Sequence, residues 1–281
     1  MRAAAFLSLS ATVQRLTSPH NPRLREAARL VASARDRRKA GKCVIEGEHL
    51  IMVYAERMGT PEVLIMSEQA LQRPAVAALG AQFANLTLVV PTPVFAELAT
   101  LPPGVGVIAV VSTPQGQASG PSEFCVLLED LQDPGNVGSI LRTAAAAGVD
   151  RVLLSKHCAF AWSPKVLRAA QGAHFLLAIE EGVDLPAWAA AFADGGGRVV
   201  ATVVKGGSAL FDASLSGRVA IAIGNEGSGL SPALEARVST RISIPMPGGM
   251  ESLNAAAAAA ICVFECVRQR LAAGEPSAGV T

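Results

Sequence analysis

Three short loops in the second half of the sequence combine glycine with a few polar side chains. The first is Ile223–Leu230, written IGNEGSGL, in which Gly224, Gly227 and Gly229 surround Glu226. Glycine in a loop costs conformational entropy, so this density indicates an unusual backbone shape or the close approach of another group. The chemistry that this loop offers is that of one rigidly held carboxylate.

The other two loops bring amides, hydroxyls and a cation to the starts of helices. In PGNVGSILR, a Pro-Gly turn leads into a helix on which Asn136 and Arg142 stand six residues apart. In PGGMESLN, Ser252, Leu253 and Asn254 precede the last helix. Helix caps and tight turns use the same residue types, so a structural role accounts for any one loop. Three such loops at the ends of strands of one sheet favour a binding site.

These loops match no standard catalytic or cofactor motif. IGNEGSGL has a carboxylate where a dinucleotide loop approaches pyrophosphate, and GGGR at 195–198 lacks the Lys-Ser/Thr ending of a phosphate loop. No GxSxG is present, and the four histidines lie outside the loops, so His174 is expected to pack or to make a local hydrogen bond. The five cysteines are scattered without CxxC spacing, which predicts neither a disulfide framework nor a metal site.

The elements that position these loops alternate between strand and helix along the whole chain. With 51% hydrophobic but only 4% aromatic residues, the core must come from Val, Leu, Ile and Ala, as in buried parallel strands. We therefore predict an α/β fold, whose second half has six parallel strands with helices on both faces and a ligand site at their carboxyl ends. The expected boundaries are a flexible tail at 1–17, a small α/β domain at 18–112, a linker at 113–122, the larger domain at 123–273 and a tail at 274–281.

Positive charge is concentrated near the start of the chain. Residues 1–60 hold 11 of the 24 Lys and Arg residues but only 5 of the 23 Asp and Glu residues. Helical spacing predicts one basic amphipathic helix within 17–41. Its charged face either binds a polyanion such as RNA or is only a solvated face. The candidate RNA-binding residues are Arg25, Arg29, Arg37, Arg38, Lys39 and Lys42.

The first residues, MRAAAFLSLSATV, faintly resemble a secretory signal, but their apolar stretch is short. We interpret them as a tail or as the product of an early start codon. The Ala-rich stretch after Asn254 is interrupted by Glu265, so no membrane span is expected. The expected location is the cytoplasm.

Three segments resemble, in order and spacing, the motifs of the SpoU (TrmH) family of RNA ribose 2′-O-methyltransferases in the SPOUT superfamily. They are LEDLQDPGNVGSILRTAAAAGV, AIAIGNEGSGL and ISIPMPGGMESLNAAAAAAICVFE. SPKVLRAAQGAHF is similar to the segment between the first two motifs, and the resemblance covers about 123–272. The stretches TSPHNPRL and VIEGEHL resemble, more weakly, an L30e-like RNA-binding domain.

This resemblance implies a parallel sheet closed by a deep trefoil knot, a rare exception among chain topologies. It implies that S-adenosylmethionine binds in the knot, where Gly224 and Gly227 leave room for it. The cofactor residues implied are Thr202, Gly224, Asn225, Gly227, Ile244, Met246 and Leu253. It also implies a homodimer formed through the knot region and the last helix, which carries Ile261, Val263, Phe264 and Val267.

The catalytic residues implied are Asn136, Arg142, Glu226, Ser252 and Asn254. Because a guanidinium is a poor base, we expect Arg142 to bind the adjacent phosphate and to stabilise the developing oxyanion, whichever group takes the proton. The other four would orient this arginine and the ribose.

A separate first domain favours 23S ribosomal RNA as the substrate. Three alternatives stay open. The first is the same reaction on tRNA, and the second is a non-catalytic RNA-binding or antibiotic-resistance relative that shields a ribosomal site. The third is a general α/β nucleotide-binding enzyme.

Overall fold

The structure is a computed structural model that describes residues 13–18, 20–98, 105–114 and 122–275. The chain divides into two compact units, residues 1–114 with 162–168 and residues 115–161 with 169–281. Most of the expected linker at 113–122 lies outside the described residues, as do residues 1–12 and 276–281 of the expected tails. Among the described residues, no helix has the length and apolar character needed to cross a bilayer.

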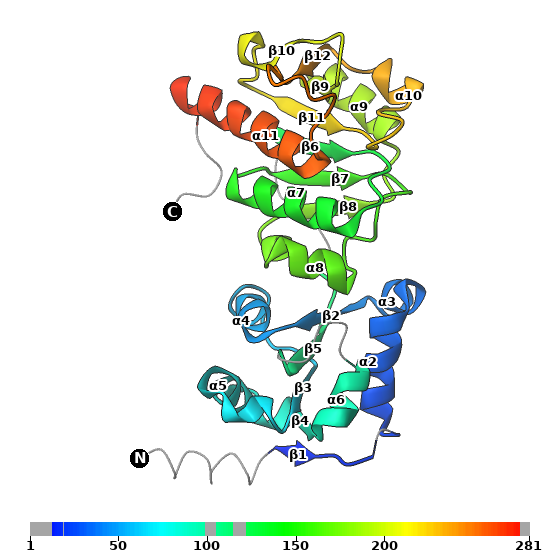
Figure 1. The fold of residues 1–281 in the computed structure, drawn as a ribbon, viewed down its shortest axis with the longest axis vertical. Coiled ribbons are helices and arrows are strands. Elements are labelled where there is room, and N and C mark those ends of the chain that lie inside the picture. Colours follow the sequence, from blue (N-terminus) through cyan, green and yellow to red (C-terminus); the bar gives the residue numbers. More distant parts are fainter. Residues whose placement is uncertain (1–12, 19, 99–104, 115–121, 276–281) are drawn as a thin grey trace. The chain divides into compact units, whose positions relative to one another are not determined.

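The first unit is a mixed five-stranded sheet in the order β1-β4-β3-β5-β2 (Figure 1). Its strands are β1 (Gln14–Arg15), β2 (Lys42–Glu46), β3 (Val63–Ser67), β4 (Thr87–Val90) and β5 (Val107–Ser112). Its helices are α2 (Pro22–Ala32), α3 (Ala34–Ala40), α4 (Glu48–Arg57), α5 (Pro74–Gln82) and α6 (Thr92–Leu98). Leu24, Ala27 and Leu30 of α2 pack with the strands and α6 in one apolar core. The L30e-like character of this unit stays a prediction.

Two expectations for the first unit were wrong. The tail expected at 1–17 ends in structure, because β1 pairs in parallel with β4 and the Leu16 N–H donates to the Val89 carbonyl at 2.9 Å. The single basic helix breaks at Ser33, whose backbone is extended and whose Oγ accepts from the Asp36 N–H at 3.1 Å. This bond caps α3 as a separate helix, which local side-chain capping favours over continuation.

The second unit is a seven-stranded sheet in the order β10-β12-β9-β11-β6-β7-β8, and every pairing in it is parallel. Its strands are β6 (Phe124–Leu128), β7 (Arg151–Leu154), β8 (Ala178–Glu181), β9 (Arg198–Thr202), β10 (Ser208–Ala209), β11 (Val219–Ile223) and β12 (Thr240–Ser243). The predicted parallel α/β fold is confirmed. The count of six strands missed β10, whose two residues carry too little pattern to be recognised.

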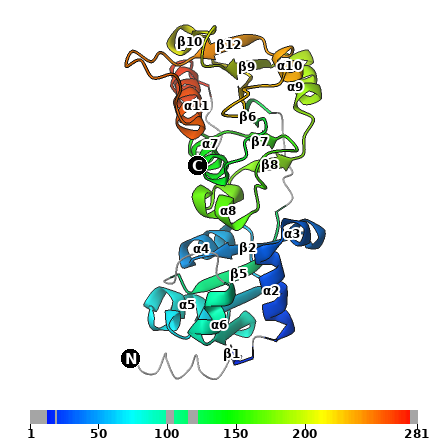
Figure 2. The same ribbon diagram turned by 45° about the vertical axis from the view of Figure 1, so that its right-hand side comes forward.

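Helices cover both faces of this sheet. They are α7 (Pro134–Ala146), α9 (Leu185–Asp194), α10 (Pro232–Glu235) and α11 (Ala255–Ala272). Helix α8 (Pro164–Ala170) lies largely within residues 162–168, which group with the first unit. The two helices α7 and α11 lie side by side on one face (Figures 1 and 2). On the other face, α9 and α10 pack on alternate strand residues such as Leu127 and Ala222.

The order of strands brings the three loops together. The loop Ile223–Leu230 follows β11, and the loop that leads to Asn136 follows its neighbour β6. The loop that leads to Asn254 follows β12, which is separated from β11 by β9. Parallel strands end at the same edge, so all three loops open there, as predicted.

Candidate active site

The loop after β11 is closed by its own backbone. The Asn225 N–H donates to the Gly229 carbonyl at 3.0 Å, and the Gly229 N–H donates back to the Asn225 carbonyl at 2.9 Å. A Cβ on Gly224 would lie 2.3 Å from the Gly229 carbonyl carbon and 2.5 Å from the Leu230 nitrogen. The returning chain by itself therefore requires glycine at 224, and the expected contact of Gly224 with a cofactor stays a prediction.

The Asn225 side chain is also used within the protein. Its Oδ1 accepts from the N–H groups of Gly227 at 2.9 Å and Ser228 at 3.1 Å, and its Nδ2 donates to the Asp130 carbonyl at 2.9 Å. A side-chain amide offers two donor hydrogens and two acceptor lone pairs, and most of these are occupied here. The polar atoms of the Asn225 side chain therefore serve mainly to hold the loop in shape.

A chain of hydrogen bonds links the three loops to one another. The Glu226 carboxylate accepts from Asn136 Nδ2 at 2.7 Å, and Asn136 Oδ1 accepts from Asn254 Nδ2 at 2.9 Å. Asn254 Oδ1 in turn accepts from the Ala256 N–H at 2.9 Å and caps α11. Because the backbone N–H of the helix can only donate, it fixes the orientation of the Asn254 amide, which in turn fixes that of Asn136. The Asn136 amide then presents its NH₂ group to the Glu226 carboxylate and holds that carboxylate in place.

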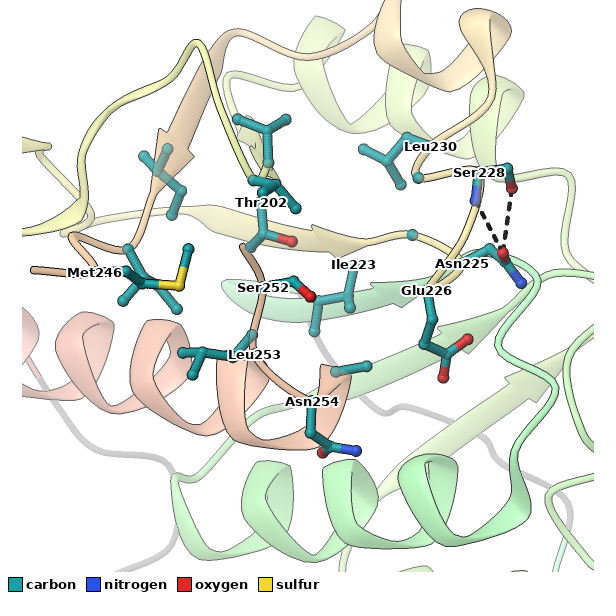
Figure 3. A pocket seen from close by; sticks show the side chains of 18 of the residues that line it. Thr202, Ile223, Asn225, Glu226, Ser228, Leu230, Met246, Ser252, Leu253 and Asn254 are labelled. Atoms are coloured by element: carbon teal, nitrogen blue, oxygen red, sulfur yellow. Dashed lines mark hydrogen bonds between the residues drawn. The ribbon is translucent and has the colours of Figure 1, made fainter. Parts of the chain in front are cut away.

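A cavity of about 440 Å³ lies at the same edge of the sheet, within the range typical of small-molecule sites (Figure 3). Of the expected cofactor residues, it is lined by Thr202, Gly224, Asn225, Ile244, Met246 and Leu253. Glu226, Ser252 and Asn254 line it as well. Gly227 is exposed and does not line it.

The remaining lining residues were missed in the sequence. They are Val203, Val204, Ile223, Ser228, Gly229, Leu230, Glu235, Ile242, Ala255 and Ala258. Four of them directly adjoin a predicted residue, and all but Glu235 lie within four residues of one, so their positions near the three loops were the available signal. Glu235 had no such signal, because it reaches the cavity from α10.

Arg142 stands apart from the cavity. It lies on α7, about 9 Å along the helix axis from Asn136, and its side chain is exposed. It does not line the cavity, and among the described residues it has no hydrogen-bond or ion-pair partner. The structure thus brings together four of the five expected catalytic residues and leaves the guanidinium available to a ligand outside the cavity.

Comparison with known proteins now assigns the family. Residues 123–264 match the SpoU rRNA Methylase family. The chain belongs to this family. It is 30% identical over 253 residues to the 23S rRNA (guanosine(2553)-2'-O)-methyltransferase RlmP of Bacillus subtilis, covering 90% of this chain and 98% of that protein. It is 32% identical over 272 residues to an uncharacterized tRNA/rRNA methyltransferase of Synechocystis, covering 95% of this chain and 98% of that protein.

The solved structures agree with the family. The SpoU methyltransferase AviRb from Streptomyces viridochromogenes, in complex with AdoMet, aligns with a TM-score of 0.80 at 28% identity, covering 90% of this chain and 99% of that one. The implied SPOUT fold of the second unit, with its knot, is confirmed by this similarity to a SpoU structure.

Other reactive side chains of this SpoU protein are buried outside the site. His174 is 1% exposed with Nε2 at 2.8 Å from the Ala161 carbonyl, and burial lowers its pKa to about 4. It is neutral near pH 7 and makes the local bond that we expected. Burial also raises the pKa of the Cys262 and Cys266 thiols to about 12, which leaves them unreactive. Within the described part of the chain, no cluster of three His, Cys, Asp or Glu residues could hold a metal ion.

Two of the expected RNA-binding cations are used inside the first unit of this SpoU protein. Arg37 is only 5% exposed, and its guanidinium donates to the carbonyls of Leu30 at 2.5 Å and Val31 at 2.9 Å. Lys42 lies 3.0 Å from Glu26 and 2.7 Å from Glu62. Hydrogen bonds to these carboxylates raise the pKa of Lys42. The assignment of Arg37 was wrong, because the fold buries this cation, which the sequence does not show. A contact of the half-buried Lys42 with RNA stays a prediction.

The other four expected RNA-binding residues have exposed side chains. They are Arg25 and Arg29 on α2 and Arg38 and Lys39 on α3.

Proposed function

We propose that this protein transfers a methyl group from S-adenosylmethionine to a ribose 2′-hydroxyl of 23S ribosomal RNA. The observation that carries the proposal is the hydrogen-bond chain from Asn254 through Asn136 to Glu226, which orients a carboxylate at the edge of a small-molecule cavity. The relative RlmP, named for this reaction on 23S rRNA, matches across both units.

The cavity fits the proposed cofactor. Apolar side chains such as Ile244, Met246 and Leu253 suit a flat purine, and the polar groups of Ser252 and Glu226 suit a ribose or a cation. S-adenosylmethionine supplies a methyl group on a positively charged sulfur. Glu226 is the carboxylate that orients the reacting groups, and its bond from Asn136 restricts its movement.

Arg142 is proposed to act on the RNA and not on the cofactor. Methyl transfer requires the ribose oxygen in line with the methyl group at roughly 3–3.5 Å and the loss of the hydroxyl proton. A guanidinium stays charged, so Arg142 holds a neighbouring phosphate and stabilises the developing oxyanion. The exposed side chain of Arg142 supports this role, because the phosphate that it binds belongs to the RNA substrate.

The direct test is transfer of labelled methyl from S-adenosylmethionine to purified ribosomal and transfer RNA, followed by mapping of the modified nucleotide. The expected product is a 2′-O-methylated nucleotide in 23S rRNA. Modification of tRNA alone would favour the alternative substrate. Binding of cofactor and RNA without transfer would favour the non-catalytic relative, and methylation of a base would contradict the proposal.

The exposed cations of α2 and α3 are proposed to hold RNA phosphates. The double variant Arg25→Glu with Arg29→Glu is expected to weaken RNA binding and to reduce the slope of log K against log salt by about 2, about one unit per lost phosphate contact. Binding isotherms at several salt concentrations measure this, with cofactor affinity expected to stay unchanged. An unchanged salt slope would contradict the assignment.

The matched control for that experiment is Arg37→Ala. Because Arg37 is buried on backbone carbonyls, its loss is expected to lower the free energy of unfolding by about 1–3 kcal/mol. The salt slope of RNA binding should not change in this variant.

We also propose that two copies pair through α11, as part of the same function. Ala257, Ile261, Phe264, Arg268 and Leu271 are all exposed and recur at intervals of four and three residues, so they form one face of the helix. Phe264 is 46% exposed and Leu271 is 61% exposed, which is unusual for apolar side chains on a helix that has no partner. Val263 is fully buried in its own unit, so the expected contribution of this residue to a dimer was wrong.

Introducing charge on this face is expected to separate the copies. Ile261→Glu with Phe264→Glu should convert a dimer into a folded monomer, measured by sedimentation and circular dichroism, because each carboxylate would be desolvated in the interface. Leu176→Glu is the control, since Leu176 is an apolar residue outside α11 that is at least as exposed as Ile261 and Phe264. A wild-type monomer, or a dimer unaffected by the α11 variant, would refute this interface.

A cytoplasmic location, where ribosomal RNA is made and folded, stays a prediction that rests on the RNA substrate.

A further inference from the structure

Two consecutive acidic residues after β6 hold both ends of the loop that carries Glu226. Glu129 is 8% exposed, and its carboxylate accepts from the Ser231 N–H at 2.7 Å and from the Ser231 Oγ at 2.8 Å. The Asp130 carbonyl accepts from Asn225 Nδ2 at 2.9 Å. The loop is therefore fastened one residue before Glu226 and again directly after Leu230.

Asp130 reaches this position through an uncommon backbone conformation. Its φ is +56°, in the left-handed region that few residues other than glycine adopt. Ser155, after β7, supports this turn, because its Oγ accepts from the Asp130 N–H at 2.9 Å and donates to Asp130 Oδ1 at 2.6 Å. Unfavourable backbone held in place by neighbours is concentrated at functional sites.

These bonds join two segments whose relative position must be fixed for Asn136 to reach Glu226. Glu129 and Asp130 lie between β6 and α7, a few residues before Asn136 in the first turn of α7, whereas Asn225 and Ser231 bracket Glu226. The bond between Asn136 Nδ2 and the Glu226 carboxylate is 2.7 Å long, so a small shift of either segment would break it. Fastening the loop at both ends prevents such a shift.

Stability alone does not call for an acid at position 129. A buried carboxylate costs desolvation that an apolar side chain of similar size avoids. Neither Glu129 nor Asp130 lines the cavity. From this geometry we propose that Glu129 and Asp130 are positioning residues for methyl transfer, which set Glu226 against Asn136 without contacting cofactor or RNA. The proposal rests on the proposed function.

The test compares Glu129→Leu with Glu129→Gln. Leu removes both acceptors at similar volume, whereas Gln keeps an acceptor for the Ser231 N–H and a donor for its Oγ. We expect Glu129→Leu to lower kcat by about 10- to 100-fold, as misplacement of a catalytic group does, with a smaller change in cofactor Kd and little change in Tm. Glu129→Gln should restore most of the rate. Ser239→Ala is the control, because its Oγ bond to the Val199 carbonyl lies away from the three loops.

Two readouts separate positioning from a general structural role. In an Asn136→Ala background, the effect of Glu129→Leu on kcat should largely disappear, since both changes break the same arrangement. In NMR spectra of the whole protein labelled at asparagine, Glu129→Leu should shift the Asn136 side-chain amide and remove its protection from exchange.

The spectra also separate this proposal from the proposed function. A wild-type protein that transfers no methyl group would refute the function, while the Asn136 amide would still report on positioning. Additive losses of rate, a fall in Tm that matches the fall in kcat, or an unshifted Asn136 amide would overturn the roles of Glu129 and Asp130.

Discussion

Arg142→Ala is expected to lower kcat for methyl transfer by about 10²- to 10³-fold, the usual loss when a group that stabilises an oxyanion is removed. The side chain is exposed on α7, and among the described residues it has no partner that its removal would leave unpaired. The loss should therefore fall on the reaction and not on stability. Steady-state kinetics with RNA, together with thermal unfolding, measure both.

The substitution Arg142→Lys tests the role in more detail. Lysine keeps the charge but loses the planar fork that holds phosphate through two hydrogen bonds, so only part of the activity should return. Cofactor affinity should not change, since Arg142 does not line the cavity. Arg237→Ala is the control, because Arg237 is an exposed arginine on the same unit. A lysine variant that binds RNA normally and reacts at the full rate would contradict the assignment.

Gly224→Ala is expected to weaken binding of S-adenosylmethionine by about 10- to 100-fold, which corresponds to about 1.4–2.8 kcal/mol. The new methyl group would meet backbone atoms of Gly229 and Leu230 at 2.3–2.5 Å, and backbone cannot rotate away as a side chain can. The paired hydrogen bonds between Asn225 and Gly229 must open, and the cavity wall moves with them. Calorimetric titration of the cofactor measures the effect.

Gly227→Ala is the matched control within the same loop. Its nearest neighbour for a new methyl group is Asn225 Oδ1 at 3.5 Å, an ordinary contact. Because glycine carries more freedom in the unfolded chain, this variant should bind cofactor normally and be as stable as the wild type or slightly more so. Equal losses in the two variants would show that the loop needs both glycines, against the geometry described above.

The sequence predicted the overall fold well, for a local reason. Apolar runs such as Val219–Ile223 and Phe124–Leu128 are buried along their whole length, and the loops after them carry glycine and polar residues, so strand, loop and helix could be recognised one at a time. The parallel sheet followed from their alternation. Short elements such as β1 and β10 were missed, since two residues carry no periodic pattern.

The residues of the candidate site could be recognised from the sequence, but the structural role of each residue could not. Gly224 and Asn225 were expected to serve the cofactor, yet both first serve the loop itself. Arg37 and Lys42 were expected to meet RNA, yet carbonyls and carboxylates of the first unit already hold them. A polar residue shows its chemistry in the sequence, but its partners are unknown until the chain is folded.

The sequence by itself therefore determined the α/β class, the three loops and the family, because these depend on residue types and on spacing along the chain. Only the tertiary structure decided which polar groups are free for a ligand. Asn136 meets Glu226, 90 residues later, and Asn254, 118 residues later. Such bonds form only where parallel strands end at one edge, so their existence is a property of the folded sheet and not of any segment.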